Sequence, residues 1–305
     1  MSAIPKFQPQ EHFAWCGWAL RIPQSWRPLK FYGNGLDGSV HLGDADRGIL
    51  RVRWKRTLDR RPDPGRWKKQ RIRTLGGHRR GRLAESAPAT PAVQETVLVQ
   101  TAQGVVWSGF SAPAGIALEI AFNAALEDGE IKAVLQQILP TMRVFPISEE
   151  TPWALFDTTF RTPPGFLLEQ HRLHLGDLAI LVATPGKNHW LMVRQVYPAE
   201  LALERRPLEK WLGLRIFPDR RRRRRFQGPD RWELRDGARA LDGLLESGVS
   251  RLPAPLGFWH PRVWTAALVR DPVADRLLMA EAELENGNPF DAVQDALSAM
   301  NRPLP

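Results

Sequence analysis

Two short motifs have the spacing of known ligand sites. Glycines at residues 33–38 follow the pattern G-x-G-x-x-G of dinucleotide-binding proteins, in which a following helix N-terminus holds the pyrophosphate. Here a strand pattern over residues 39–42 follows, so we predict a turn between two strands. His171 and His174 offer two imidazoles, but a strand would place them on opposite faces, and no nearby Cys or acidic pair completes a metal site. Neither motif predicts a cofactor or a metal ion.

Nucleophiles and acid pairs give no catalytic arrangement either. Cys16 is the single cysteine, which excludes an internal disulfide and a multi-cysteine zinc site, and between two tryptophans it is expected to pack rather than react. Glu149 and Glu150 fall in a predicted linker, and Glu281 and Glu283 fall on a predicted strand. The chain has no serine nucleophile elbow, P-loop or zinc-protease helix. We therefore predict that the protein is not an enzyme and has no catalytic residues, cofactor or metal site.

Composition is that of a folded protein of about two domains. The chain has 305 residues, of which 43% are hydrophobic and 25% are charged. Residues 1–10 contain prolines and no apolar core, so no secretory signal is expected. The uncharged residues 96–118 are interrupted by polar residues and a proline, so no membrane insertion is expected. We predict a cytoplasmic location.

Positive charge is concentrated in two segments. The chain carries 43 Lys and Arg against 33 Asp and Glu, a net charge of +10. Residues 51–83 hold 14 Lys or Arg and two acids, and residues 214–236 hold nine Arg and four acids, so the rest of the chain is net acidic. Such segments bind polyanions or acidic protein surfaces. Because only 8 of the 43 basic residues are lysine, accumulation of arginine without selection for binding is an alternative.

The same two segments supply the expected binding residues. Trp67 lies among lysines and arginines, an arrangement that suits phosphate contact combined with stacking. Six adjacent guanidinium groups repel one another, so we expect residues 214–236 to form a solvated or anion-bound loop. The expected anion-contacting or partner-contacting residues are Arg60, Arg61, Lys68, Lys69, Arg71, Arg73, Arg79, Arg80, Arg82, Arg205, Arg206, Arg220, Arg221, Arg222, Arg223, Arg224 and Arg225.

Two classes of partner fit these residues. The first hypothesis is a non-catalytic adaptor or structural subunit that binds a protein partner, or a larger assembly, through acidic surfaces on that partner. The alternative is nucleic acid, which the same arginines would serve, although the chain has no helix-turn-helix, zinc finger or RNA-recognition motif. We favour the protein partner.

The chain also contains an internal repeat, which predicts two copies of one domain. The order of the blocks is kept and only the distances between them change. The matching blocks are Leu20-Arg21-Ile22-Pro23 with Phe160-Arg161-Thr162-Pro163, Leu50-x-Val52-Arg53 with Leu191-x-Val193-Arg194, Arg60-Arg61-Pro62 with Arg205-Arg206-Pro207, Val106-Trp107 with Val263-Trp264, and Leu126-Glu127 with Leu284-Glu285.

Hydrophobic periodicity predicts the elements within each copy. Leu50, Val52 and Trp54 alternate with charged residues, which is typical of a strand buried on one face. The sequence predicts a hairpin formed by residues 96–99 and 105–110. A helix is expected over residues 131–139 and another from Pro289, each closing its copy, with a shorter helix ending at Trp211.

The opening motif of the second copy, Phe160-x-x-Pro163-x-Gly165-Phe166, and the closing helix that runs into a strand over residues 134–145 resemble PsbP/DcrB-like domains. The resemblance implies an α/β/α sandwich that acts by surface binding rather than catalysis, and it transfers no binding residues. We therefore predict an α+β fold of two tandem α/β/α sandwich domains with antiparallel sheets. The first repeat would span residues 13–146 with a basic insert at 51–83, and the second would span residues 152–303 with the Arg-rich loop at 214–236.

Overall fold

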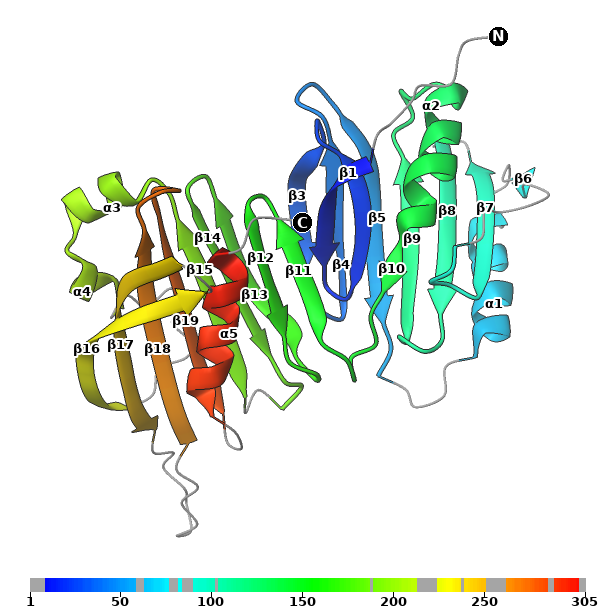
Figure 1. Ribbon diagram of the computed structural model, residues 1–305. Helices are drawn as coiled ribbons and strands as arrows, with labels where there is room; N and C mark the ends of the chain where they lie inside the picture. Colours follow the sequence, from blue (N-terminus) through cyan, green and yellow to red (C-terminus); the bar gives the residue numbers. More distant parts are fainter. Residues whose placement is uncertain are drawn as a thin grey trace, which may run out of the picture. The chain divides into compact units, whose positions relative to one another are not determined.

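The computed structural model describes most of the chain (Figure 1). The described residues are 9–58, 63–76, 82–83, 90–101, 104–186, 189–212, 224–236, 239–250, 262–284 and 288–301. Contacts divide the chain into two compact units, Met1–Phe156 (unit 1) and Asp157–Pro305 (unit 2). Each unit is described below by itself.

Unit 1 contains two antiparallel sheets. The strands of the smaller sheet that belong to unit 1 are, in order, β10 (Arg143–Val144), β2 (Trp18–Pro23), β1 (Pro9–Trp15) and β11 (Thr151–Leu155). Strand β12 (Thr158–Thr162) belongs to unit 2. The larger one has seven strands, in the order β3 (Arg27–Gly33), β4 (Asp37–Gly43), β5 (Gly48–Arg56), β9 (Ile116–Phe122), β8 (Gly104–Ser111), β7 (Glu95–Thr101) and β6 (Arg82–Leu83).

Unit 2 is built around a sheet of seven strands with the corresponding order. It runs β13 (Leu167–His174), β14 (Asp177–Ala183), β15 (Trp190–Val196), β19 (Arg276–Leu284), β18 (Arg262–Asp271), β17 (Arg239–Ser250) and β16 (Arg224–Asp236). Val106-Trp107 and Val263-Trp264 lie on β8 and β18, the fifth strand in each order. This correspondence is what a duplicated domain predicts, while the limits 13–146 and 152–303 stay a prediction.

The strands follow from the alternation in the sequence. In β5, Leu50, Val52 and Trp54 are buried and Arg51 and Arg53 are exposed, as the two-residue period predicts. The predicted hairpin of residues 96–110 is confirmed as β7 and β8, and the glycine-rich residues 33–38 form the turn between β3 and β4. A helix does not follow that turn, so the dinucleotide interpretation fails there.

The helices are short. They are α1 (Pro64–Gly76), α2 (Asp128–Ala133), α3 (Ala199–Arg205), α4 (Leu208–Leu212) and α5 (Pro289–Asn301). The closing helix of unit 1 continues from α2 through a π-helical turn, Val134–Ile138, and a 3-10 turn, Leu139–Thr141, and ends just after Pro140. The last helix begins as predicted, because the Asn288 side chain accepts a hydrogen bond from the Phe290 backbone N–H at 3.1 Å.

The predicted α+β class, two α/β/α sandwiches, is wrong. The structure consists mostly of antiparallel β sheets, and helices of 5 to 13 residues do not build complete layers. In unit 1 the inner face of the large sheet packs against the small sheet, where the Trp18 and Trp54 rings lie 6.4 Å apart. Hydrophobic periodicity predicted the positions of the closing helices, but it did not predict the second sheet that covers this face. The predicted loop at 214–236 is also wrong over its second half, because Arg224–Asp236 forms β16, paired with β17.

Candidate anion-binding face

The predicted basic residues of unit 1 meet on α1. Asp63 caps this helix by accepting a hydrogen bond from the Arg66 backbone N–H at 3.0 Å, and Pro64 occupies the first turn. The helix sequence contains no acid. Its half-buried residues turn toward the sheet, and Arg66, Lys69 and Arg73 are exposed.

The inner side of α1 is attached to the sheet by stacking and ion pairs. Trp67 stacks on Phe110 of β8 with ring centroids 5.4 Å apart. Lys68 Nζ lies 2.6 Å from Glu95 Oε2, whereas Arg71 donates a hydrogen bond to Ser108 Oγ at 3.1 Å and pairs with Glu119. Burial, with the neighbouring Arg53, lowers the pKa of Arg71. Two of the predicted anion ligands, Lys68 and Arg71, are therefore engaged within the fold.

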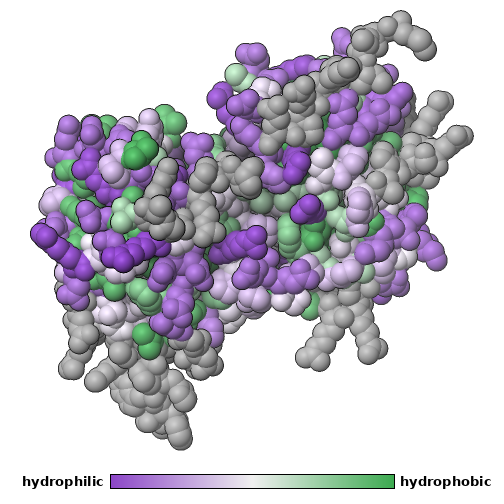
Figure 2. Space-filling view, in the orientation of Figure 1, coloured by the Kyte–Doolittle hydropathy of each residue, from purple (hydrophilic) through white to green (hydrophobic). Residues whose placement is uncertain are grey.

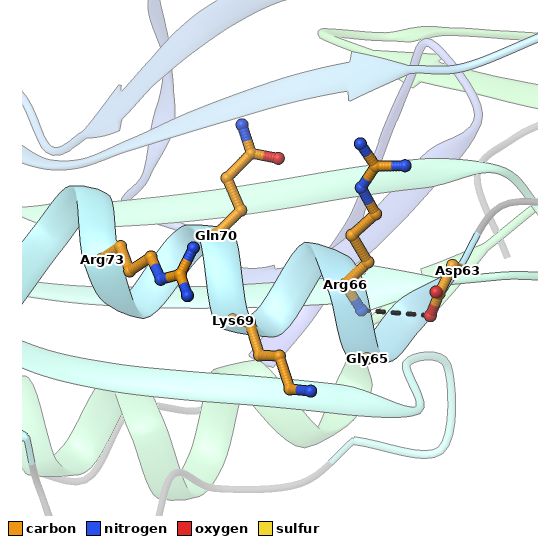
Figure 3. Close-up of a pocket in the computed structure, with 6 residues that line it drawn as sticks. All are labelled: Asp63, Gly65, Arg66, Lys69, Gln70 and Arg73. Atoms are coloured by element: carbon orange, nitrogen blue, oxygen red, sulfur yellow. Dashed lines mark hydrogen bonds between the residues drawn. The ribbon is translucent and has the colours of Figure 1, made fainter.

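The outer side of α1 presents three cations with i, i+3, i+7 spacing. Arg66, Lys69 and Arg73, the helix cations, form no ion pair with any residue that the structure describes. With Asp63, Gly65 and Gln70 they line a hollow of about 640 Å³. Figure 3 shows Arg66 and Gln70 leaving one flank of the helix and Lys69 leaving the other.

A second set of cations lies on the outer face of the sheet, and the sequence search did not select it. We call Lys30, Arg51, Arg53 and Lys55 the sheet cations. Strand pairing places them in rows across β3, β4 and β5: Lys30 with His41 and Arg51, Tyr32 with Ser39 and Arg53, and Asp37 with Lys55. The alternating sequence of β5 could have revealed Arg51, Arg53 and Lys55, but adding Lys30 requires the register of three strands.

Few acidic side chains neutralise the charge of the sheet cations. Arg53 lies 4.0 Å from Glu119 of β9, and the other three form no ion pair with a described residue. Burial and the positive charges of Arg51 and Lys30 lower the pKa of His41. Burial is the larger cause, and the two cations add to it.

A second hollow, of about 630 Å³, lies between the two sets of cations. Lys55 from β5 and Arg66 from α1 line it, over an apolar floor that includes Trp67, Phe110 and Ala117. Arg56, Arg71 and the acid Asp63 also line it, so its lining has four cations and one acid. The arrangement can bind an anion, and we see no nucleophile held beside a general base in it.

The corresponding arginines of unit 2 have a different environment. Arg194, the counterpart of Arg53 in the repeat, is only 5% exposed. It donates hydrogen bonds to both Asp177 carboxylate oxygens at 2.8 and 3.0 Å, and its guanidinium lies 4.9 Å from the centre of the Trp211 ring. Arg206 also stacks on Trp211 at 5.8 Å, and its carbonyl accepts the indole N–H at 3.1 Å. Arg205 is exposed at the end of α3.

The remaining predicted binding residues lie on other strands or outside the described residues. Arg82 lies on β6, and Arg224 and Arg225 lie on β16. The others lie outside the described residues: Arg60, Arg61, Arg79, Arg80, Arg220, Arg221, Arg222 and Arg223.

The other candidate groups form no site in the described structure. Cys16 is buried, and burial raises the pKa of its thiol. Burial lowers the pKa of His171 on β13. Within the described ranges, no group of three or more His, Cys, Asp or Glu residues could hold a metal ion. Among the helices described, none has the length and apolarity that a membrane crossing requires. The visible surface carries mainly hydrophilic residues with scattered hydrophobic patches (Figure 2).

Comparison with solved structures gives a weak likeness. No family model matches the chain, so the PsbP/DcrB-like resemblance stays a prediction, and no curated protein matches it. A solved structure that matches is the apo structure of immunity protein TplEi of T6SS from Pseudomonas aeruginosa. The two sequences are 11% identical, and the match covers 96% of this chain and 97% of the immunity protein's chain, with a TM-score of 0.30. At this TM-score the likeness does not establish a shared fold.

Proposed function

We propose that this protein is a non-catalytic binding protein that recognises an acidic surface on a protein partner. The observation that carries the proposal is the outer side of α1, where Arg66, Lys69 and Arg73 are exposed on a helix without acids. Complementary charge across an interface speeds association and selects among partners. A carboxylate-rich surface is the complement of this helix face.

The attachment of α1 supports a binding role. The Trp67–Phe110 stack and the Lys68–Glu95 ion pair fix the helix on β7 and β8 before any partner arrives. Rigid presentation lowers the conformational entropy that binding would otherwise cost. The inner cations thus secure the helix, and the outer cations remain available for a partner.

The experiment is capture of partners by tagged protein from its native lysate after nuclease treatment. The wild type is compared with the helix variant, Arg66→Ser with Lys69→Ser and Arg73→Ser. The matched control is Arg21→Ser with Lys132→Ser and Arg143→Ser, which removes the same charge from exposed positions elsewhere in unit 1. We expect acidic proteins to be retained by the wild type and the control and lost from the helix variant. Retention of nucleic acid alone, abolished by nuclease, would overturn the proposal in favour of polyanion binding.

A further inference from the structure

Three of the sheet cations form a column along β5, beside α1, whose Arg71 shares Glu119 with Arg53. Arg51, Arg53 and Lys55 are exposed and alternate with buried residues, so they share one face. Alternate residues of a strand lie about 6.8 Å apart, so the column presents three cations over roughly 14 Å. Lys30 adds a fourth cation in the row of Arg51, two strands away. The spacing is therefore regular and matches the repeat of an extended chain.

Unit 2 shows what the same strand looks like when it is covered. The repeat places Met192 and Val196 of β15 at the positions of Arg51 and Lys55. Both are buried in an apolar cluster to which α3 and α4 contribute. In unit 1, α1 packs on β7 and β8, as α4 packs on the corresponding β17 and β18, but no described helix takes the place of α3, which contacts β19. The β5 column is exposed. The charged, open strand is thus a property of unit 1, not of the repeated sheet.

We infer that the β5 column binds an acidic segment of the partner in extended conformation, with a carboxylate at every second residue. The inference rests on the proposed function, since it names the form in which the acidic partner is recognised. An extended peptide and a β strand have the same two-residue repeat, so consecutive carboxylates meet Arg51, Arg53 and Lys55 in turn. The guanidinium groups of Arg51 and Arg53 can each hold one carboxylate through paired hydrogen bonds.

The surroundings of the column favour a peptide over a nucleic acid. Glu119 pairs across from Arg53 on β9, and Asp37 pairs across from Lys55 on β4. These acids flank the column on its two sides, and the three cations in line along β5 suit one extended chain. Tyr32 is the exposed aromatic residue in the rows, and its ring already contacts His41 at 6.0 Å. Single-stranded nucleic acids are held by stacking of successive bases on several aromatic rings.

The pKa of His41 provides a local measure of binding. Lys30 and Tyr32 face this imidazole from β3, and Arg51 faces it from β5. Carboxylates on the column offset the charges of Arg51 and Lys30, which lower the pKa of His41. The pKa of His41, which burial lowers first and these two charges lower further, therefore rises on binding.

The test uses defined probes on the full chain at low ionic strength. A labelled peptide of alternating Glu and Thr is compared with a peptide of the same composition in which all Glu residues are adjacent. An oligothymidylate of similar charge is the third probe. We expect the alternating peptide to bind best, and Arg51→Ser with Arg53→Ser to weaken it by about tenfold, as loss of two ion pairs predicts. The control Lys132→Ser with Arg143→Ser should leave its affinity unchanged.

Each outcome decides the inference. Equal affinity for the two peptides, or an unchanged affinity in the Arg51/Arg53 variant, would overturn it, and so would tighter binding of the oligothymidylate. A rise in the His41 pKa on saturation with the alternating peptide, seen by NMR titration, supports it. If neither peptide binds but the helix variant still loses acidic partners from the lysate, the proposed function stands and the β5 site alone is rejected.

Discussion

Arg53 on β5 and Arg194 on β15 occupy matching positions in the repeat but have opposite environments. The Arg53 side chain is 52% exposed and lies 4.0 Å from Glu119. The Arg194 side chain is 6% exposed and is bound by both oxygens of Asp177 beneath the Trp211 ring. One arginine is thus available at a surface, while the other is part of the packing of unit 2.

This difference predicts unequal costs for the same substitution. Arg194→Met removes the two hydrogen bonds to the Asp177 carboxylate, which keeps Arg172 at 3.6 Å, and should lower the free energy of unfolding by about 1.5–3 kcal/mol. Arg53→Met removes an exposed group and should change it by less than about 0.5 kcal/mol. Urea unfolding followed by circular dichroism measures both. Similar losses in the two variants would contradict the structural role assigned to Arg194.

A second prediction concerns Arg56, a buried cation whose guanidinium donates hydrogen bonds to backbone carbonyls. It is 6% exposed and donates hydrogen bonds to the carbonyls of Ala114, Cys16 and Phe145 at 2.9, 3.4 and 3.3 Å. Arg56→Met leaves these buried acceptors without a donor, which should cost about 1–3 kcal/mol of unfolding free energy. Thermal unfolding of the variant measures the loss.

Gly17 provides an independent test of the Arg56 position. Its φ is +82°, and a Cβ there would collide with the Arg56 guanidinium. Gly17→Ala should therefore destabilise unit 1 by at least about 1 kcal/mol. The control is Gly65→Ala at the start of α1, where the added methyl meets only ordinary contacts and should be neutral or mildly stabilising. Equal melting temperatures for the two alanine variants would contradict the position of the Arg56 guanidinium beside Gly17.

A third prediction concerns the attachment of α1. A helix of 13 residues is marginal by itself, so its order depends on the Trp67–Phe110 stack. Trp67→Ala should expose α1 to trypsin, which cleaves after its lysines and arginines, and should weaken capture of acidic partners. Trp67→Phe keeps a stacking ring and should retain most of both properties. Unchanged cleavage in Trp67→Ala would mean that the ion pairs alone hold the helix.

Local elements could be predicted from the sequence better than their assembly. The alternation around Val52 and the proline-led start of α5 depend on neighbouring residues, and both elements formed where expected. The layer that covers a sheet depends on contacts distant in the chain, such as Trp18 with Trp54, which periodicity does not encode. The same difference between local and distant information applies to the residues of the site. Lys69 and Arg73 were found from their local charge, whereas Lys30 joined Arg51 only through the pairing of three strands.

The last prediction is a dependence of stability on pH set by partly buried histidines. Burial lowers the pKa of His12, His41 and His171, with Arg21 and Arg143 adding to the effect at His12, and Arg51 and Lys30 at His41. Their pKa values in the folded state therefore lie below the ordinary value of about 6.5 that the unfolded chain retains. Between these values the unfolded state binds more protons, so stability is full above about pH 6.5 and falls as the pH decreases through this window.

Urea midpoints at a series of pH values measure the effect. His41→Gln should reduce the loss of stability below about pH 6.5, because one of the groups that takes up a proton on unfolding is gone. Arg51→Ser should raise the pKa of His41 in the folded protein, since it removes one of the charges that oppose protonation, whereas Lys132→Ser should leave it unchanged. NMR titration of the imidazole distinguishes these variants. A His41 pKa that does not respond to Arg51→Ser would mean that burial alone sets it, and the positive potential assigned to the β5 face would lose its support.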